Sequence, residues 1–219
     1  TVVDPATGEP AKDVDVVVVM SDQQGVELWE QVAELSARIS LATPRAIHLQ
    51  GRALQDIIPR YDMVLVMDYG LGLLTPRLIE LLSKQAPFLA VNTQTNSANM
   101  GFNYITKYPR ADFASISEPE LRMALHEKHA PLEQLFTGLM ERLGMKLASL
   151  TLANRGALIF DGKTVHHIPV FSQKVVDRIG AGDAYLAVAA PVVQLGDAPP
   201  EVVGFLGNVA GAIACTIVA

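Results

Sequence analysis

The sequence has few of the side chains that bind metals through sulfur or neutralise nucleic acids. Cys215 is the single cysteine among 219 residues, so an internal disulfide and a cysteine-based metal cluster are excluded. Charged residues make up only 18% of the chain, and 17 basic against 23 acidic residues leave a net charge of -6. Because binding to a nucleic-acid backbone requires a basic surface, nucleic acid is not an expected partner. A lone cysteine is typical of a reducing compartment, which predicts a cytoplasmic protein.

The abundant residues are those that build a buried core. Half of the residues are hydrophobic, and a chain of this length buries roughly 70% of the surface that it exposes when unfolded. This composition excludes intrinsic disorder and makes one domain the default expectation.

The C-terminal segment Val202–Ala219 lacks charged residues over 18 positions, the lower length for a membrane span. Gly204, Gly207, Asn208 and Gly211 lie within it, and no basic residues flank it. We therefore expect a helix buried in a protein core, and no association with a membrane.

Apolar segments with strand and helix periodicity alternate along most of the chain. Short β-branched or apolar runs predict strands at 16–20, 46–49, 63–67, 88–91, 113–116 and 147–152. Helical spacing predicts helices at 26–39, 76–84 and 132–143. This alternation predicts an α/β fold in which helices cover both faces of a mostly parallel sheet.

The C-terminal part of the chain departs from this alternation. Asp161-Gly162 separates two short apolar runs, which predicts a β-hairpin of residues 157–160 and 164–168 at an edge of the sheet. From residue 184 onward only Asp197 and Glu201 are charged. This segment is therefore predicted to form two buried helices, separated near residues 196–200.

A glycine-containing loop before these helices carries the strongest chemical signal. Gly180 and Gly182 flank Ala181 and lack Cβ atoms, so successive backbone N–H groups can turn toward one point at a helix N-terminus. Such a point favours an anion, for example a phosphoryl group. Asp183 would lie beside it, placed to take a proton from an attacking hydroxyl. The alternative is a plain tight turn in which Asp183 only stabilises the helix N-terminus.

Residues 177–183, Asp-Arg-Ile-Gly-Ala-Gly-Asp, resemble the Asp-x-x-Gly-Ala-Gly-Asp signature of the ribokinase-like, or PfkB, carbohydrate kinases. The loop Asp68-Tyr69-Gly70-Leu71-Gly72 is similar to one in the heptose-phosphate kinase branch. The resemblance covers about residues 61–219, and 1–60 match only loosely. It implies a ribokinase-like three-layer sandwich with Asp183 as catalytic base and Gly180, Ala181 and Gly182 as an anion hole. It also places Asp68 and Asp177 on the substrate or phosphate side.

The sequence resembles the family at its nucleotide-binding positions, with one glycine replaced. Residues 151–156, Thr-Leu-Ala-Asn-Arg-Gly, resemble the Thr-x-Gly-x-x-Gly nucleotide loop. This implies that Thr151, Ala153 and Gly156 bind nucleotide, with Ala153 in place of the first glycine. Asn208 falls where the family lines its adenine pocket.

Two further positions depart from the family pattern in ways that affect charge. Ser117-Glu118-Pro119-Glu120 stands at the Asn-x-x-Glu position, whose glutamate helps to organise magnesium and phosphate, which implies Glu120 as a metal-binding residue. The same Ser-x-x-Glu pattern is a helix capping box that requires no ligand, and both interpretations stay open. Asn92-Thr93-Gln94 replaces an Asp-Pro-Lys-like string, so Asn92 would face the substrate or phosphate without a charge.

The resemblance implies an ATP-dependent kinase that moves the γ-phosphoryl group of ATP, with Mg²⁺, onto a hydroxyl of a sugar or sugar phosphate. The alternative is a nucleotide-binding regulatory module or an inactive truncated kinase relative.

Family members carry an additional N-terminal region with a Gly-Gly substrate motif, whereas this sequence contains no Gly-Gly pair. We therefore expect residues 1–219 to be a single partial kinase domain without the sugar-binding part. Its parent chain can be fused to a nucleotidyltransferase. Exposed strand edges of such a fragment predict a homo-oligomer.

Overall fold

A computed structural model of the chain describes residues 16–20, 52–72, 74–97, 99–171 and 176–216. The helix predicted at 26–39 and the strand predicted at 46–49 lie outside these described residues. The other predicted strands and helices are all present, with ends that differ by one or two residues.

A seven-stranded sheet forms the middle layer, and its strands lie side by side in the order of the sequence. Five strands are parallel and the last two form an antiparallel hairpin, as the sequence predicts. The strands are β1 (Val16–Met20), β2 (Met63–Asp68), β3 (Leu89–Thr93), β4 (Phe113–Ser117), β5 (Ala148–Thr151), β6 (Ala157–Phe160) and β7 (Val165–Ile168).

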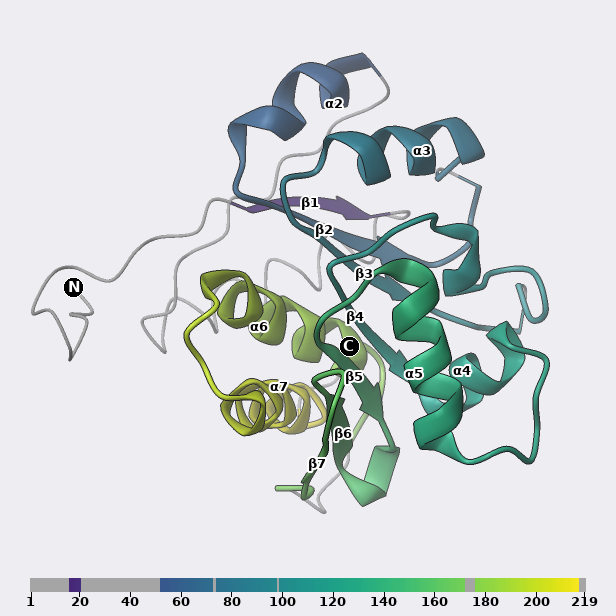
Figure 1. The fold of residues 1–219 in the computed structure, drawn as a ribbon, viewed down its shortest axis with the longest axis vertical. Coiled ribbons are helices and arrows are strands. Elements are labelled where there is room, and N and C mark those ends of the chain that lie inside the picture. The colour runs from purple at the N-terminus through teal and green to yellow at the C-terminus, as the bar shows by residue number, and fades with distance from the viewer. Residues whose placement is uncertain (1–15, 21–51, 73, 98, 172–175, 217–219) are drawn as a thin grey trace, which may run out of the picture.

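Helices cover both faces of this sheet, which confirms the predicted three-layer α/β sandwich (Figure 1). One face carries α2 (Arg52–Ile57), α3 (Pro76–Gln85), α4 (Glu118–Ala124) and α5 (Leu132–Leu143). The other carries α6 (Ala181–Leu195) and α7 (Pro200–Ala214). The parallel strands follow one another across the sheet, and their crossovers have a single hand. The helices that connect them therefore lie on the same face of the sheet. The opposite face is therefore left for the two helices that follow the hairpin.

The local sequence explains where the helices begin and end. Thr75 is the N-cap of α3, where its Oγ1 accepts a hydrogen bond from the Leu78 N–H at 3.3 Å, and Pro76 occupies the first helical position. Gly144 ends α5 and Gly196 ends α6, with φ values of 73° and 83°. This left-handed conformation favours glycine because a Cβ atom would clash.

Glycines on α7 let this helix pack closely against its neighbours. A Cβ atom built on Gly204 would lie 2.5 Å from Cγ1 of Ile168, and one on Gly207 would lie 2.6 Å from Cζ of Tyr185. The glycines that interrupt the apolar C-terminal segment are therefore contact points with β7 and α6. Within the described residues, no helix is both long enough and apolar enough to cross a membrane.

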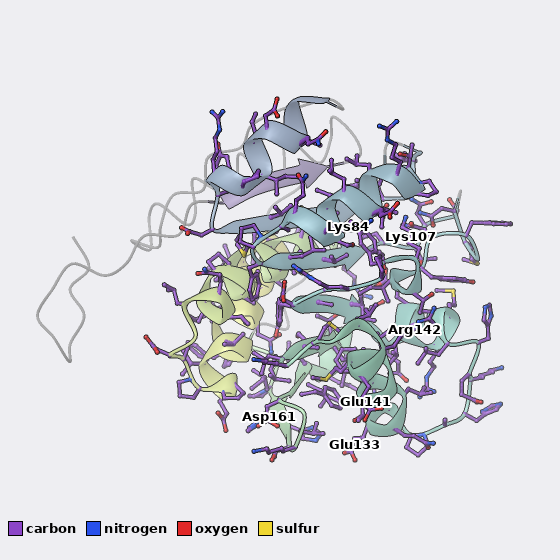
Figure 2. The ribbon with its side chains drawn as sticks, turned by 45° about the horizontal axis from the view of Figure 1, so that its top comes forward. Lys84, Lys107, Glu133, Glu141, Arg142 and Asp161 are labelled. Atoms are coloured by element: carbon purple, nitrogen blue, oxygen red, sulfur yellow. The ribbon has the colours of Figure 1, made fainter. Side chains whose placement is uncertain are left out.

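His166 joins the hairpin to α7. Its Nε2 lies 3.1 Å from Oδ2 of Asp161, which Figure 2 labels, and its Nδ1 lies 2.8 Å from Oε1 of Glu201. The hydrogen bond with Asp161 is the largest cause that raises the pKa of His166. The imidazole therefore helps to fix the turn of the hairpin to the start of α7.

Replacing Gly207 by alanine tests the close approach of α6 and α7. Because the added Cβ would meet the buried ring of Tyr185, we expect Gly207→Ala to lower the free energy of unfolding by about 1–3 kcal/mol. Gly138→Ala is the matched control, since nothing lies within 4 Å of a Cβ on this α5 residue. The control should stabilise the protein by about 0.5–1 kcal/mol in the same urea titration. Equal effects of the two substitutions would contradict the tight packing.

Candidate functional site

The carboxyl ends of the parallel strands bring together polar residues on the face that α6 covers. Asp68 pairs with Thr93 in the sheet, so the residues that follow them, Tyr69 and Gln94, are neighbours. Ser117 pairs with Thr151 further along the same edge. This edge is where open α/β sheets bind ligands.

Asp183 lies over this edge, in the first turn of α6, and its side chain is 2% exposed. The hydroxyl of Tyr69 donates a hydrogen bond to its Oδ2 at 2.9 Å, and Nε2 of Gln94 donates to its Oδ1 at 2.7 Å. Neither donor was singled out from the sequence. A signal for both was present, because each directly follows a buried strand and alternation places it on the α6 face.

The residues of the predicted anion hole form the start of α6. Gly180 is the N-cap of α6 with φ of 77°, and its carbonyl accepts the first helical hydrogen bond, from the Ala184 N–H at 2.9 Å. The Gly182 N–H precedes that bond and has no partner within the helix, whereas the Ala181 N–H donates to the carbonyl of Arg178 at 3.4 Å. A Cβ atom on Gly182 would lie 3.7 Å from Nδ2 of Asn92, an ordinary van der Waals contact, so no protein atom requires glycine there.

Asn92 lies next to Gly182 and is 4% exposed. Its Nδ2 donates to the carbonyl of Ser115 at 2.9 Å. Its Oδ1 and the hydroxyl of Ser115 are buried without a hydrogen-bond partner among the described residues. The side chain nearest to Gly182 is therefore polar and uncharged.

Asp68 faces away from Asp183, toward the layer of α3. It is 1% exposed, and its Oδ2 accepts from the Tyr108 hydroxyl at 2.7 Å and lies 2.5 Å from Nζ of Lys107. Burial raises the pKa of Tyr108, and the charge of Asp68 raises it further. Oδ1 of Asp68 accepts from the Gly70 N–H at 3.0 Å. The structure therefore shows Asp68 in a buried ion pair, and its predicted role on the substrate side stays a prediction.

Asp177 braces the loop before the anion hole. Its Oδ1 accepts a hydrogen bond from the Ile179 N–H at 3.0 Å. The N–H groups of Val176 and Asp177 both donate to the carbonyl of Cys215, at 2.8 and 3.2 Å. The C-terminal end of α7 thus fixes the start of this loop.

The predicted nucleotide loop follows β5 and contains a residue in strained backbone geometry. Ala153 has φ of 53°, a left-handed conformation that glycine adopts more easily. Gly156 has φ of 86°, and a Cβ there would lie 2.0 Å from the carbonyl oxygen of Ile168. Nδ2 of Asn208 donates to the Pro169 carbonyl at 3.0 Å, and Oγ1 of Thr151 donates to that of Ile116 at 3.4 Å. These side chains hold the loop and the end of the hairpin in place.

Glu120 forms the capping box that the sequence left as one of two interpretations. Its Oε2 accepts from the N–H and the hydroxyl of Ser117, at 2.8 and 2.7 Å. Its Oε1 accepts from the Thr95 N–H at 2.9 Å. A carboxylate offers about four acceptor positions, so one stays available for a further partner. The described part of the chain contains no group of three His, Cys, Asp or Glu residues arranged to hold a metal ion.

Comparison with known proteins identifies the family of this chain. Residues 13–217 match the pfkB family carbohydrate kinases. The chain belongs to this family.

This pfkB chain matches only part of the length of its curated relatives. The bifunctional protein HldE of Wolinella succinogenes is 26% identical over 183 residues, which cover 82% of this chain and 36% of that protein. HldE of Koribacter versatilis is 29% identical over 200 residues, which cover 90% of this chain and 39% of that protein. The chain thus spans less than two fifths of the length of these relatives.

Solved structures share the ribokinase-like fold. The ribokinase of Thermotoga maritima superimposes with a TM-score of 0.59 at 15% identity, covering 93% of this chain and 75% of that one. Phosphofructokinase-2 of Escherichia coli in complex with potassium gives a TM-score of 0.64 at 12% identity, with 95% and 78% covered. These matches confirm the predicted ribokinase-like sandwich.

The strained backbone of Ala153 predicts a stabilising substitution. A left-handed alanine is strained by about 1–2 kcal/mol, and glycine would relieve this strain. The greater conformational entropy of glycine in the unfolded chain offsets part of the gain, so Ala153→Gly should stabilise the protein by about 0.5–1 kcal/mol. Ala212→Gly in α7 is the matched control and should destabilise it by about 1 kcal/mol. Both changes are measured by thermal unfolding. A loss of stability in Ala153→Gly would show that the alanine is unstrained.

Proposed function

We propose that this protein is the catalytic part of an ATP-dependent kinase that phosphorylates a hydroxyl of a sugar or sugar phosphate. The observation that carries the proposal is the buried Asp183 at the N-terminus of α6, directly after Gly180, Ala181 and Gly182. A base adjacent to an anion site is the arrangement that phosphoryl transfer to a hydroxyl needs. Membership of a carbohydrate kinase family supports this assignment.

The reaction proceeds by in-line displacement at the γ-phosphorus. The substrate hydroxyl oxygen forms a bond to this phosphorus while its proton moves to an oxygen of Asp183. The bond from the γ-phosphorus to the bridging oxygen breaks, and the electron pair stays on ADP. The N–H groups of the anion hole stabilise the charge on the transferred group. Asp177 braces this loop from a distance and does not take the proton.

ATP and magnesium belong to the proposal. Thr151, Ala153, Gly156 and Asn208 would line the nucleotide site, since they lie along the loop after β5 and on α7, which packs against the hairpin. Magnesium usually keeps several waters and binds phosphates with one or two carboxylates. The available acceptor position of Glu120 fits such an ion and would supply one ligand, while the ion itself neutralises phosphate charge.

The substrate-binding part is proposed to lie in a longer polypeptide. The chain spans 36% of the first relative, which is named as a bifunctional protein, and this favours a parent chain with a second activity, such as a nucleotidyltransferase. A heptose phosphate is the substrate that the resemblance of residues 68–72 favours. A cytoplasmic location and self-association of this chain stay proposals.

Binding of nucleotide by this chain alone is the first test. ATP or ADP at millimolar concentration with magnesium should raise the melting temperature, because ligand binds only the folded state. In Gly182→Val the shift should disappear, since a branched side chain at the start of α6 would obstruct the approach of a phosphate. Gly138→Val in α5 should keep the shift. Absence of a shift in the unmodified chain would reject the nucleotide site.

Substitution of the base tests the mechanism in the full-length protein. Asp183→Asn keeps the size of the side chain but removes its basicity, so turnover should fall by roughly 10²- to 10⁴-fold. ATP affinity should change little, and Asp177→Asn should cost less turnover. ADP release is measured with ribose, fructose 6-phosphate and a heptose phosphate. Normal turnover in Asp183→Asn would leave Asp183 as a helix-stabilising carboxylate and contradict the kinase mechanism.

A further inference from the structure

We propose that Tyr69 and Gln94 are positioning residues that hold the carboxylate of Asp183 in the orientation for proton transfer. This inference rests on the proposed kinase function. Tyr69 follows β2 and Gln94 follows β3, so two neighbouring strands of the sheet reach one residue of α6.

The two hydrogen bonds fix the carboxylate because they end on different oxygens. Tyr69 contacts Oδ2 at 2.9 Å and Gln94 contacts Oδ1 at 2.7 Å. A carboxylate with one donor can still rotate about its terminal bond, whereas two donors on opposite oxygens select one orientation.

The backbone of both donors is fixed in turn by two buried asparagines. Nδ2 of Asn99 donates to the carbonyl of Tyr69 at 2.6 Å and to that of Gln94 at 3.0 Å. Nδ2 of Asn103 donates to the carbonyl of Gln94 at 3.0 Å. The asparagines are 5% and 2% exposed, so these bonds are shielded from water.

Only glycine at position 70 permits this arrangement. Gly70 has φ of 71°, and a Cβ atom there would lie 2.7 Å from Nδ2 of Asn99 and 2.8 Å from Cγ of Asn103. The loop after β2 can therefore pass close to both amides, which aligns Tyr69 with Gln94. Positions held in this way are typical of groups that support a reacting side chain.

Both donors are neutral, and this matters for a base. A lysine or arginine at the same distance would stabilise the charged carboxylate more strongly and weaken it as a proton acceptor. The phenol of Tyr69 and the amide of Gln94 orient the carboxylate without bringing a positive charge to it.

The test uses steady-state kinetics of the full-length protein with ATP and the sugar substrate that gives turnover. Tyr69→Phe and Gln94→Met each remove one donor and keep the size of the side chain. We expect kcat to fall about tenfold in each, in line with the loss of a hydrogen bond to a charged group, while KM for ATP and the melting temperature stay nearly unchanged. Tyr61→Phe and Gln134→Met are the matched controls and should keep full turnover.

Combination with Asp183→Asn separates positioning from a general structural role. If the two donors act through Asp183, Tyr69→Phe should lower kcat little further in an Asp183→Asn background. A full additional loss in that background, or unchanged kcat in both single variants, would overturn the inference and leave the kinase function standing. If the unmodified full-length protein releases no ADP with any of the three sugars, the proposed function fails and this inference fails with it.

Discussion

The buried ion pair between Asp68 and Lys107 is the interaction on which the functional edge of this protein depends. Asp68 ends β2 with its carboxylate 1% exposed, and the hydroxyl of Tyr108 and the ammonium group of Lys107 both reach it. The side chain of Lys107 is 29% exposed, so removing Lys107 would leave the charge of Asp68 buried without compensation, whereas Lys107 itself reaches water. The segment from the end of β3 to residue 108 is thereby tied to β2 on the face opposite Asp183.

The end of β2 contacts both layers of helices, because successive side chains of a strand point to opposite faces of the sheet. Asp68 points to the layer of α3, whereas Tyr69 points to the layer of α6 and donates to Asp183. The carbonyl of Asp68 also accepts from the backbone N–H of Gln94 at 2.9 Å and from Nδ2 of Asn103 at 2.8 Å. Anchoring on one face thus determines the geometry of the proposed base on the other face.

The α6–α7 layer completes the site from the opposite direction. Glycines on α7 allow it to approach α6 and β7, and Asn208 of the same helix bonds to the backbone that leaves the hairpin. The carbonyl of Cys215, directly after α7, receives the N–H groups of Val176 and Asp177. The loop that begins at Val176 is therefore held in place by α7, which starts more than twenty residues later in the sequence.

The sequence by itself determined the fold class, the hairpin, the two apolar C-terminal helices and the place of Asp183 at the N-terminus of the first of them. These features depend on periodicity and on local residue types, which are readable along the chain. Only the tertiary structure showed that Asp68 lies in an ion pair while Tyr69 and Gln94 contact Asp183. Those contacts join residues up to 114 positions apart, and their geometry depends on strand register and on the face toward which each side chain points. Local sequence patterns do not encode such long-range pairings.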